Sequence, residues 1–144
     1  MNRVIQLMGE KNHFLEKFMS LNEQQIMRLE QGHFDQIENF YNQREDLIKI
    51  IKYIDAEINK AQMQNETSNL RTTESDKSVI RENLKIKDTY TAKILDQDIQ
   101  VLALIDKAKS QIIKELQNVR RGRRAMTGYK WLSVALNICF CILI

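Results

Sequence analysis

The most restrictive feature of this 144-residue sequence is that it contains no proline. Proline removes a helix hydrogen bond and clashes with the preceding turn, so a chain without it permits long uninterrupted helices. Glycine is also scarce, with four residues, and no stretch alternates apolar and polar residues between turn signals as a half-buried strand would. These observations predict an all-α protein.

Apolar residues recur at alternating three- and four-residue steps, which is the spacing of a coiled-coil-like seam. The seam of the middle segment runs from Ile37 to Ala61 with Ile51 near its centre, and that of the last segment runs from Leu95 to Val119. The first segment has a looser seam. The polar residues that interrupt the three seams are Lys11, Asn22, Gln25, Arg44, Asp98 and Lys109.

Two breaks divide the chain into three helices. Gly32 ends the first, and Asp35 is expected in the first turn of the next, where a carboxylate favours the helix dipole. Residues 65–78 are rich in Ser, Thr and Asn, and Thr73 or Ser75 would cap the third helix. The predicted helices span about 3–30, 34–64 and 77–121. The predicted fold is an elongated antiparallel three-helix bundle with coiled-coil-like packing, a long last helix and an apolar C-terminal tail (bundle 1–124, tail 125–144).

The net charge of +3 is local in origin. Of the 22 basic residues, five lie in the segment from Arg120 to Lys130. The rest of the chain has 17 basic and 19 acidic residues, so it is nearly neutral. A general nucleic-acid binder would spread Lys and Arg over a face, so nucleic acid is not an expected partner. Residues 1–10 lack the apolar core of a signal peptide, and a cytoplasmic location is therefore expected.

Little in the sequence suggests an enzyme or a cofactor. His13 and His33 are the only histidines, and neither has a cysteine or paired carboxylate at ligand spacing. Cys139 and Cys141 could form a metal or redox pair, but they fit better as small residues of an apolar tail. No glycine-rich phosphate loop follows a strand. We expect no catalytic residues, no metal site and no cofactor.

Methionine gathers in the first segment, which holds Met1, Met8, Met19 and Met27 of the six in the chain. A stripe of flexible thioethers suits an adaptable face for partners. The same residues would also serve a three-helix core in which the first helix touches both others. The sequence leaves both interpretations open.

Two stretches carry a resemblance to a known family. "LEQGHFDQIENFYNQREDLIKIIKYIDAEI", residues 29–58, joins a helix, a glycine-containing break, an aromatic–Asp pair and an amphipathic helix. "ILDQDIQVLALIDKAKSQIIKELQNVRRGRRAMTGY", residues 94–129, ends a long helix in a basic segment and a tyrosine. In both stretches the chain resembles the flagellar type III export chaperones of the filament-cap and hook-associated types, over roughly residues 8–129.

The resemblance implies a cytoplasmic helical chaperone that binds a secreted flagellar subunit, keeps it unpolymerised and delivers it to the export gate. In that family the end of the last helix engages the helical end of the subunit. The corresponding residues here are Leu102, Ile105, Ile112, Leu116 and Val119. Docking to the gate is expected at Arg123, Arg124 and Tyr129, and a homodimer is left open.

The uncharged run from Trp131 to Ile144 departs from the polar tails of that family. It raises a rival interpretation, a tail-anchored SNARE-like adaptor associated with a membrane through residues 125–144. A helix of the 14 residues from Trp131 would rise only about 21 Å, against roughly 30 Å of bilayer hydrocarbon. The sequence therefore leaves three fates for the tail: insertion in a membrane, packing on the bundle, or contact with a partner.

Overall fold

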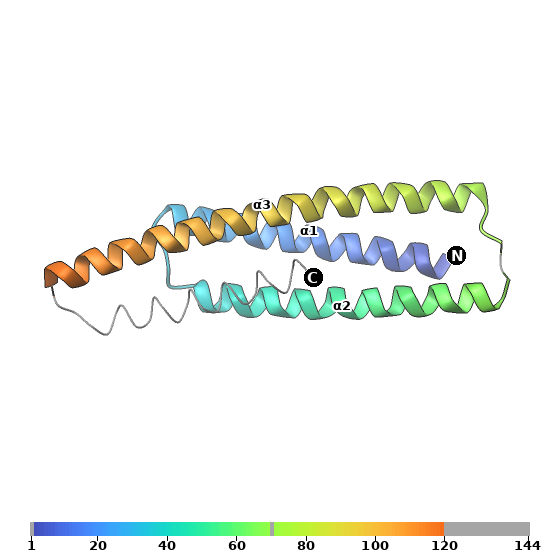
Figure 1. The fold of residues 1–144 in the computed structure, drawn as a ribbon, viewed down its shortest axis with the longest axis horizontal. Helices are drawn as coiled ribbons and strands as arrows, with labels where there is room; N and C mark the ends of the chain where they lie inside the picture. The colour runs from blue at the N-terminus through green and yellow to red at the C-terminus, as the bar shows by residue number, and fades with distance from the viewer. Residues whose placement is uncertain (1, 70, 120–144) are drawn as a thin grey trace. The chain divides into compact units, whose positions relative to one another are not determined.

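The computed structural model describes residues 2–69 and 71–119. They form three α-helices, labelled in chain order in Figure 1: α1 (Asn2–Glu30), α2 (Ile37–Thr67) and α3 (Glu74–Val119). No strand occurs in these two ranges. The predicted all-α class and three-helix bundle are confirmed.

The turn between α1 and α2 is a Schellman motif centred on Gly32. The His33 amide donates to the carbonyl of Arg28 at 2.9 Å, and the Gly32 amide donates to the carbonyl of Leu29 at 3.0 Å. Gly32 has a φ of 79°, in the left-handed region that a glycine enters without steric cost. The break predicted here is therefore confirmed. The second helix was expected from residue 34 with Asp35 in its first turn, which is wrong: α2 begins at Ile37, because the chain needs three further residues to reverse direction after the motif.

A capping box starts α3. The Asp76 amide donates to Thr73 Oγ1 at 3.1 Å, and the Thr73 amide donates to Asp76 Oδ2 at 3.4 Å. These reciprocal bonds satisfy two backbone donors that a helix N-terminus otherwise leaves open. They start α3 three residues before the predicted position 77, and the expectation that Thr73 caps it is confirmed.

The helices pack in two compact units, and each helix contributes one segment to each unit. Unit 1 comprises Met1–Met19 and Asp46–Ile94, and unit 2 comprises Ser20–Glu45 and Leu95–Ile144. The two units are built differently.

Unit 2 has a core to which all three helices contribute. The buried members come from the end of α1, the beginning of α2 and the second half of α3. They are Ile26, Leu29, Ile37, Phe40, Tyr41, Val101 and Ile105. Leu21, Leu102 and Leu104 pack against this cluster from the side. The predicted seams of α2 and α3 therefore face each other in unit 2.

Unit 1 has a smaller core, which comes from α1 and α2 alone. Its buried members are Val4, Leu7, Ile54 and Ala61, with Met8, Phe14 and Ile58 packed beside them. Within the described part of α3 in this unit, the only buried apolar side chain is Ile94. Ile51, predicted near the centre of the seam, is only half-buried.

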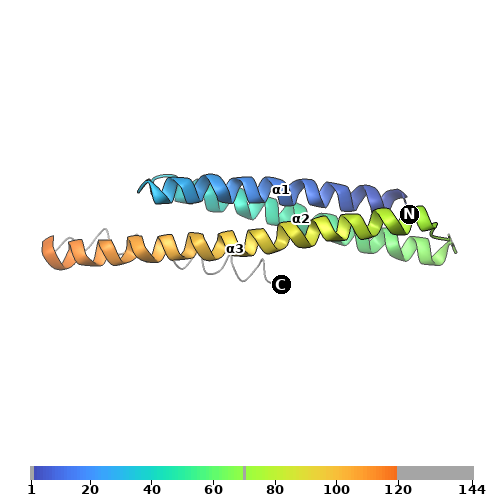
Figure 2. The ribbon, with the colours of Figure 1, turned by 90° about the horizontal axis from the view of Figure 1, so that it is seen from above.

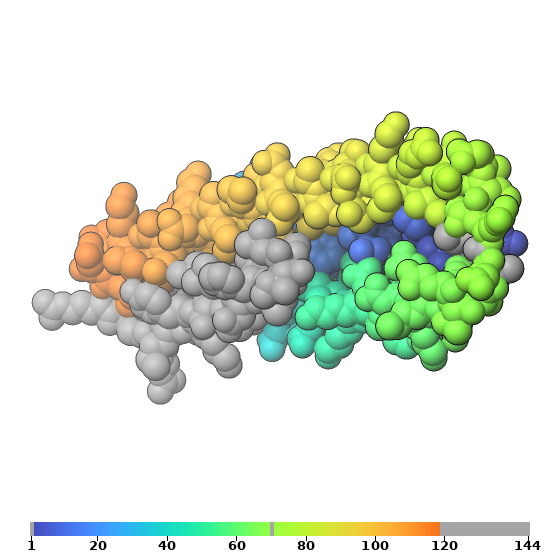
Figure 3. Space-filling model, turned by 45° about the vertical axis from the view of Figure 1, so that its right-hand side comes forward, coloured from blue at the N-terminus to red at the C-terminus, as the bar shows by residue number. Residues whose placement is uncertain are grey.

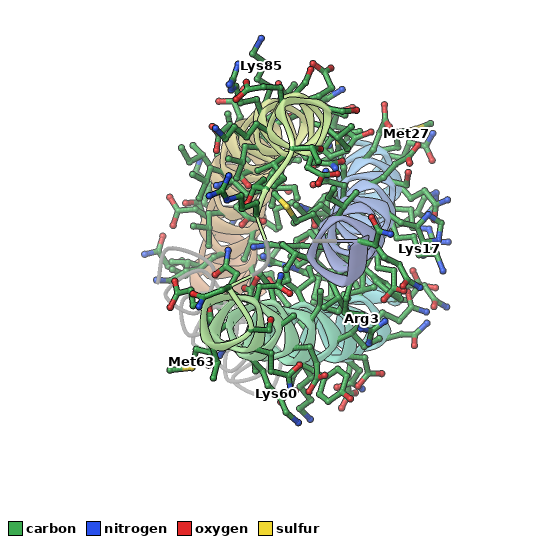
Figure 4. The ribbon with its side chains drawn as sticks, turned by 90° about the vertical axis from the view of Figure 1, so that its right-hand side faces the viewer. Arg3, Lys17, Met27, Lys60, Met63 and Lys85 are labelled. Atoms are coloured by element: carbon green, nitrogen blue, oxygen red, sulfur yellow. The ribbon has the colours of Figure 1, made fainter. Side chains whose placement is uncertain are left out.

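The outer faces of the helices are polar. Figure 4 shows Arg3 and Lys17 of α1, Lys60 of α2 and Lys85 of α3 pointing away from the space between the helices. Met8 packs against the core of unit 1, as expected if the methionines of the first helix serve the bundle. Met27 is exposed, as expected if they form a face for partners.

Candidate partner-binding surface

The end of α3 in unit 2 continues beyond the other helices of that unit. Figures 1 and 2 both show the orange turns of α3 extending past the turn that joins α1 to α2. The last buried apolar residue of the described part of α3 is Ala108. Ile112, Ile113 and Leu116 follow it, all half-buried, and none of them belongs to either core cluster. These three residues are called the terminal stripe below.

The predicted subunit-binding residues divide between the core and this stripe. Ile105 is buried in the core of unit 2, and Leu102 packs against that core. Both therefore support the helix from inside and present no free surface to a partner. Ile112 and Leu116 lie in the terminal stripe. Val119 is the last residue of α3, and its side chain lies outside the described residues.

A groove of about 220 Å³ lies in unit 2 just before the terminal stripe. Its walls are the end of α1, the turn after it and α3 as far as Gln111. Phe34 lines the groove and is 39% exposed. The groove has a mixed lining, with Glu30, Lys107 and Gln111 beside the apolar Leu29, Phe34 and Leu104, and the half-buried terminal stripe follows it along α3.

The residues expected to dock to an export gate, Arg123, Arg124 and Tyr129, lie outside the described residues, as does the apolar tail 125–144. Their predicted roles stay predictions.

A buried polar layer crosses unit 2 beside its apolar core. Asp98 of α3 accepts a hydrogen bond from Arg44 Nη2 of α2 at 2.8 Å and another from Asn22 Nδ2 of α1 at 3.3 Å, both at Oδ1. The exposed fractions of Asn22, Arg44 and Asp98 are 0%, 1% and 4%. The Arg44 guanidinium also lies over the Phe40 ring, 5.6 Å from its centroid. One residue from each helix thus meets in a single layer.

The electrostatics of the layer follow from its burial. Burial raises the pKa of Asp98 from its ordinary value of 3.8, and this effect exceeds the opposing influence of the Arg44 charge and of the hydrogen bonds from Asn22 and Arg44. Asp98 Oδ2 and Gln25 Nε2 are buried and make no hydrogen bond to any described protein group. An incompletely satisfied polar layer in a core is a poor source of stability.

Each of the three residues of this layer interrupts a seam in the sequence. Asn22 breaks the first seam, Arg44 the second and Asp98 the third. In the sequence each of them is a separate exception to its own seam. The signal available was that Arg44 of the second seam and Asp98 of the third carry opposite charges, which favours a pair between helices.

Unit 1 has a groove of its own, of about 270 Å³. In Figure 3, blue atoms of α1 are visible between the green of α2 and the yellow-green of α3. The groove is lined by apolar residues such as Met8 and Ile80 and by the ion pair of Lys11 with Asp55, whose Nζ and Oδ1 are 2.7 Å apart. The apolar spacing did not predict this groove, because the predicted seam of the last segment begins only at Leu95.

No group of three or more His, Cys, Asp or Glu side chains is placed to share a metal ion in residues 2–69 and 71–119. No helix in the same ranges is long and apolar enough to cross a membrane.

Comparison with protein-family models, with curated proteins and with solved structures finds no match to this chain.

Proposed function

We propose that this protein is a cytoplasmic flagellar export chaperone that binds a hook-associated or filament-cap subunit, keeps it unpolymerised and delivers it to the type III export gate. The observation that carries the proposal is the terminal stripe, a row of apolar side chains on the part of α3 that extends past the apolar core of unit 2. An amphipathic helix of a partner can pack along such a row and complete a bundle.

The groove before the stripe adds to this proposal. It lies between the end of α1 and α3 and reaches Gln111, the residue before Ile112. A partner helix that starts beside Phe34 would therefore pass onto the stripe without a gap. Covering the stripe and the groove with an apolar helix would stabilise the complex by removing apolar surface from water.

The test is co-expression with hook-associated and filament-cap subunits, followed by purification on a tag placed at the N-terminus of this chain. We expect one such subunit to co-purify and to be protected from proteolysis. Leu116→Asp should abolish co-purification, because it places a charge in the stripe. Gln117→Asp introduces the same charge at the next, exposed position and should leave co-purification intact.

Both variants should keep the wild-type melting temperature, which separates a lost surface from a lost fold. If no secreted flagellar subunit co-purifies with the wild-type chain, the proposal is wrong. Gate docking is tested separately: Tyr129→Ala should weaken binding to an export-gate component and leave subunit binding unchanged.

The sequence of residues 131–144 favours a second candidate, a tail-anchored helical adaptor, because the run is uncharged. Carbonate extraction of cell membranes separates the two candidates. A chaperone is released into the supernatant, whereas an anchored adaptor stays with the membrane. Retention in the membrane together with no bound flagellar subunit would replace the first candidate by the second.

A further inference from the structure

We infer that the unit 2 groove beside the terminal stripe fixes the direction in which a partner helix lies, because its two walls carry opposite charges. The occupant is an amphipathic helix with basic side chains along one flank and acidic side chains along the other. The inference rests on the proposed function, since it takes this occupant to be a helix of the bound subunit. It adds the charge pattern of that helix and the two residues that recognise it, Glu30 and Lys107.

The two charges come from different walls of the groove. Glu30 is the last residue of α1, and Lys107 belongs to α3. The two helices lie side by side in unit 2, where Asn22 of α1 donates a hydrogen bond to Asp98 of α3. Glu30 and Lys107 are both exposed, and neither makes an ion pair with another described residue. Both charges are therefore available to a molecule that enters the groove.

Between these charges the groove offers apolar contacts. Leu29, Phe34 and Leu104 line it, and the half-buried terminal stripe follows along α3. An apolar strip with one negative and one positive edge is complementary to an amphipathic helix whose flanks carry the opposite charges. Charge complementarity of this kind contributes to specificity and orientation more than to affinity.

The opposite signs of the two edges distinguish the two directions of such a helix. A helix whose apolar face stays in the groove exchanges its left and right flanks when it is reversed end to end. In one direction its basic flank meets Glu30 and its acidic flank meets Lys107, and both contacts are attractive. In the other direction like charges meet at both walls and repel. Two walls of the same sign could not make this distinction.

Two synthetic peptides test the inference with the full-length chain. Both are amphipathic helices of about four turns with the same apolar positions, and they differ only in that the Lys flank and the Glu flank are exchanged. Each peptide carries a nitroxide at its N-terminus, which broadens the NMR signals of nearby amides. We expect one peptide to broaden the signal of Gly32, in the groove, and the other to broaden that of Gln117, beside the stripe. The preference for one direction should be about tenfold in each case.

The variant Glu30→Lys/Lys107→Glu exchanges the charges of the two walls and should reverse the direction of both peptides. The matched control Glu23→Lys/Lys114→Glu makes the same exchange at two exposed positions of unit 2 that do not line the groove, and should leave both directions unchanged. In about 1 M NaCl the preference should weaken, because salt screens exposed charges, while the peptides stay bound through their apolar faces.

The inference would be overturned if both peptides lay in the same direction, if the exchange of wall charges did not reverse them, or if neither peptide bound. Co-purification of a flagellar subunit together with any of these results would leave the proposed function standing. Directional peptide binding by a chain that co-purifies with no flagellar subunit would instead make the chaperone proposal wrong and support the directional role of Glu30 and Lys107.

Discussion

The same helix, α3, is held in two different ways by the two units. In unit 2 it contributes Val101 and Ile105 to a core shared by three helices and ties itself to α1 and α2 through Asp98. In unit 1 it adds no side chain to the core cluster, and its Val79 and Leu84 are 42% and 41% exposed. In unit 1, α3 is joined to α1 by a hydrogen bond from Asn12 Nδ2 to the backbone carbonyl of Asn83, at 3.0 Å.

This difference shows how one continuous helix can combine a fixed part with a loosely held part. Burial of apolar surface is the main source of stability, so the part of α3 in unit 2 should open only with the whole fold. The part in unit 1 borders a groove and should open at a lower free energy. The terminal stripe belongs to unit 2 as well, but it follows Ala108, the last buried apolar residue of the described part of α3.

The largest expected effect comes from the buried ion pair. Arg44→Met leaves the Asp98 carboxylate buried without a cation and should lower the free energy of unfolding by about 3–5 kcal/mol. The counterpart in unit 1 is Lys11→Met, which breaks a pair whose side chains are 20% and 46% exposed. Surface pairs of that kind contribute about 1 kcal/mol or less. Urea denaturation of both variants measures the difference, and equal losses would contradict the contrast between the units.

The next effect compares two isoleucines of α3. Ile105→Ala, in the core of unit 2, should lower the free energy of unfolding by about 2–5 kcal/mol through lost burial and a residual cavity. Ile80→Ala, on the wall of the unit 1 groove, should lower it by about 1 kcal/mol, since its side chain is half-buried and lies outside the core cluster of that unit. Thermal and urea unfolding give both values. An Ile80→Ala loss as large as that of Ile105→Ala would show that α3 packs equally firmly in unit 1.

A smaller effect is a dependence on pH that belongs to unit 2. Because the pKa of Asp98 is raised on folding from 3.8, the folded protein binds this proton more tightly than the unfolded chain does. The associated stability is fully present below pH 3.8 and decreases as the pH rises through the folded pKa. The free energy of unfolding of the wild type, measured relative to Asp98→Asn, should therefore fall over this interval. A relative stability that rises with pH would mean that Arg44 dominates burial and lowers the pKa.

The helices were largely predictable from the sequence, and the meeting of their polar residues was not. Apolar spacing, the glycine at position 32 and the threonine at position 73 act locally, so the number of helices and two of their ends could be predicted. Which layer of one helix faces which layer of another depends on packing between distant segments. Periodicity gives the face on which Arg44 or Asp98 lies, but it does not say that the two meet.

The candidate surface shows the same limit. The family resemblance predicted one row for a partner, formed by Leu102, Ile105, Ile112, Leu116 and Val119. The structure divides its described side chains between the core and the terminal stripe. Spacing alone could not predict this division, because it depends on where α1 ends and α2 begins beside α3 in unit 2. The groove beside Phe34 depends in the same way on the three-residue extension of the turn before Ile37.

Amide hydrogen exchange along α3 tests the central claim most directly. It compares residues 78–92 in unit 1 with residues 97–108 in unit 2, in the wild-type protein under native conditions. We predict that the unit 1 amides exchange faster, by on the order of tenfold or more, because they open without global unfolding. The unit 2 amides should exchange only at the free energy of global unfolding. Equal protection along both parts of α3, or greater protection in residues 78–92, would contradict the claim that unit 2 is what holds this helix.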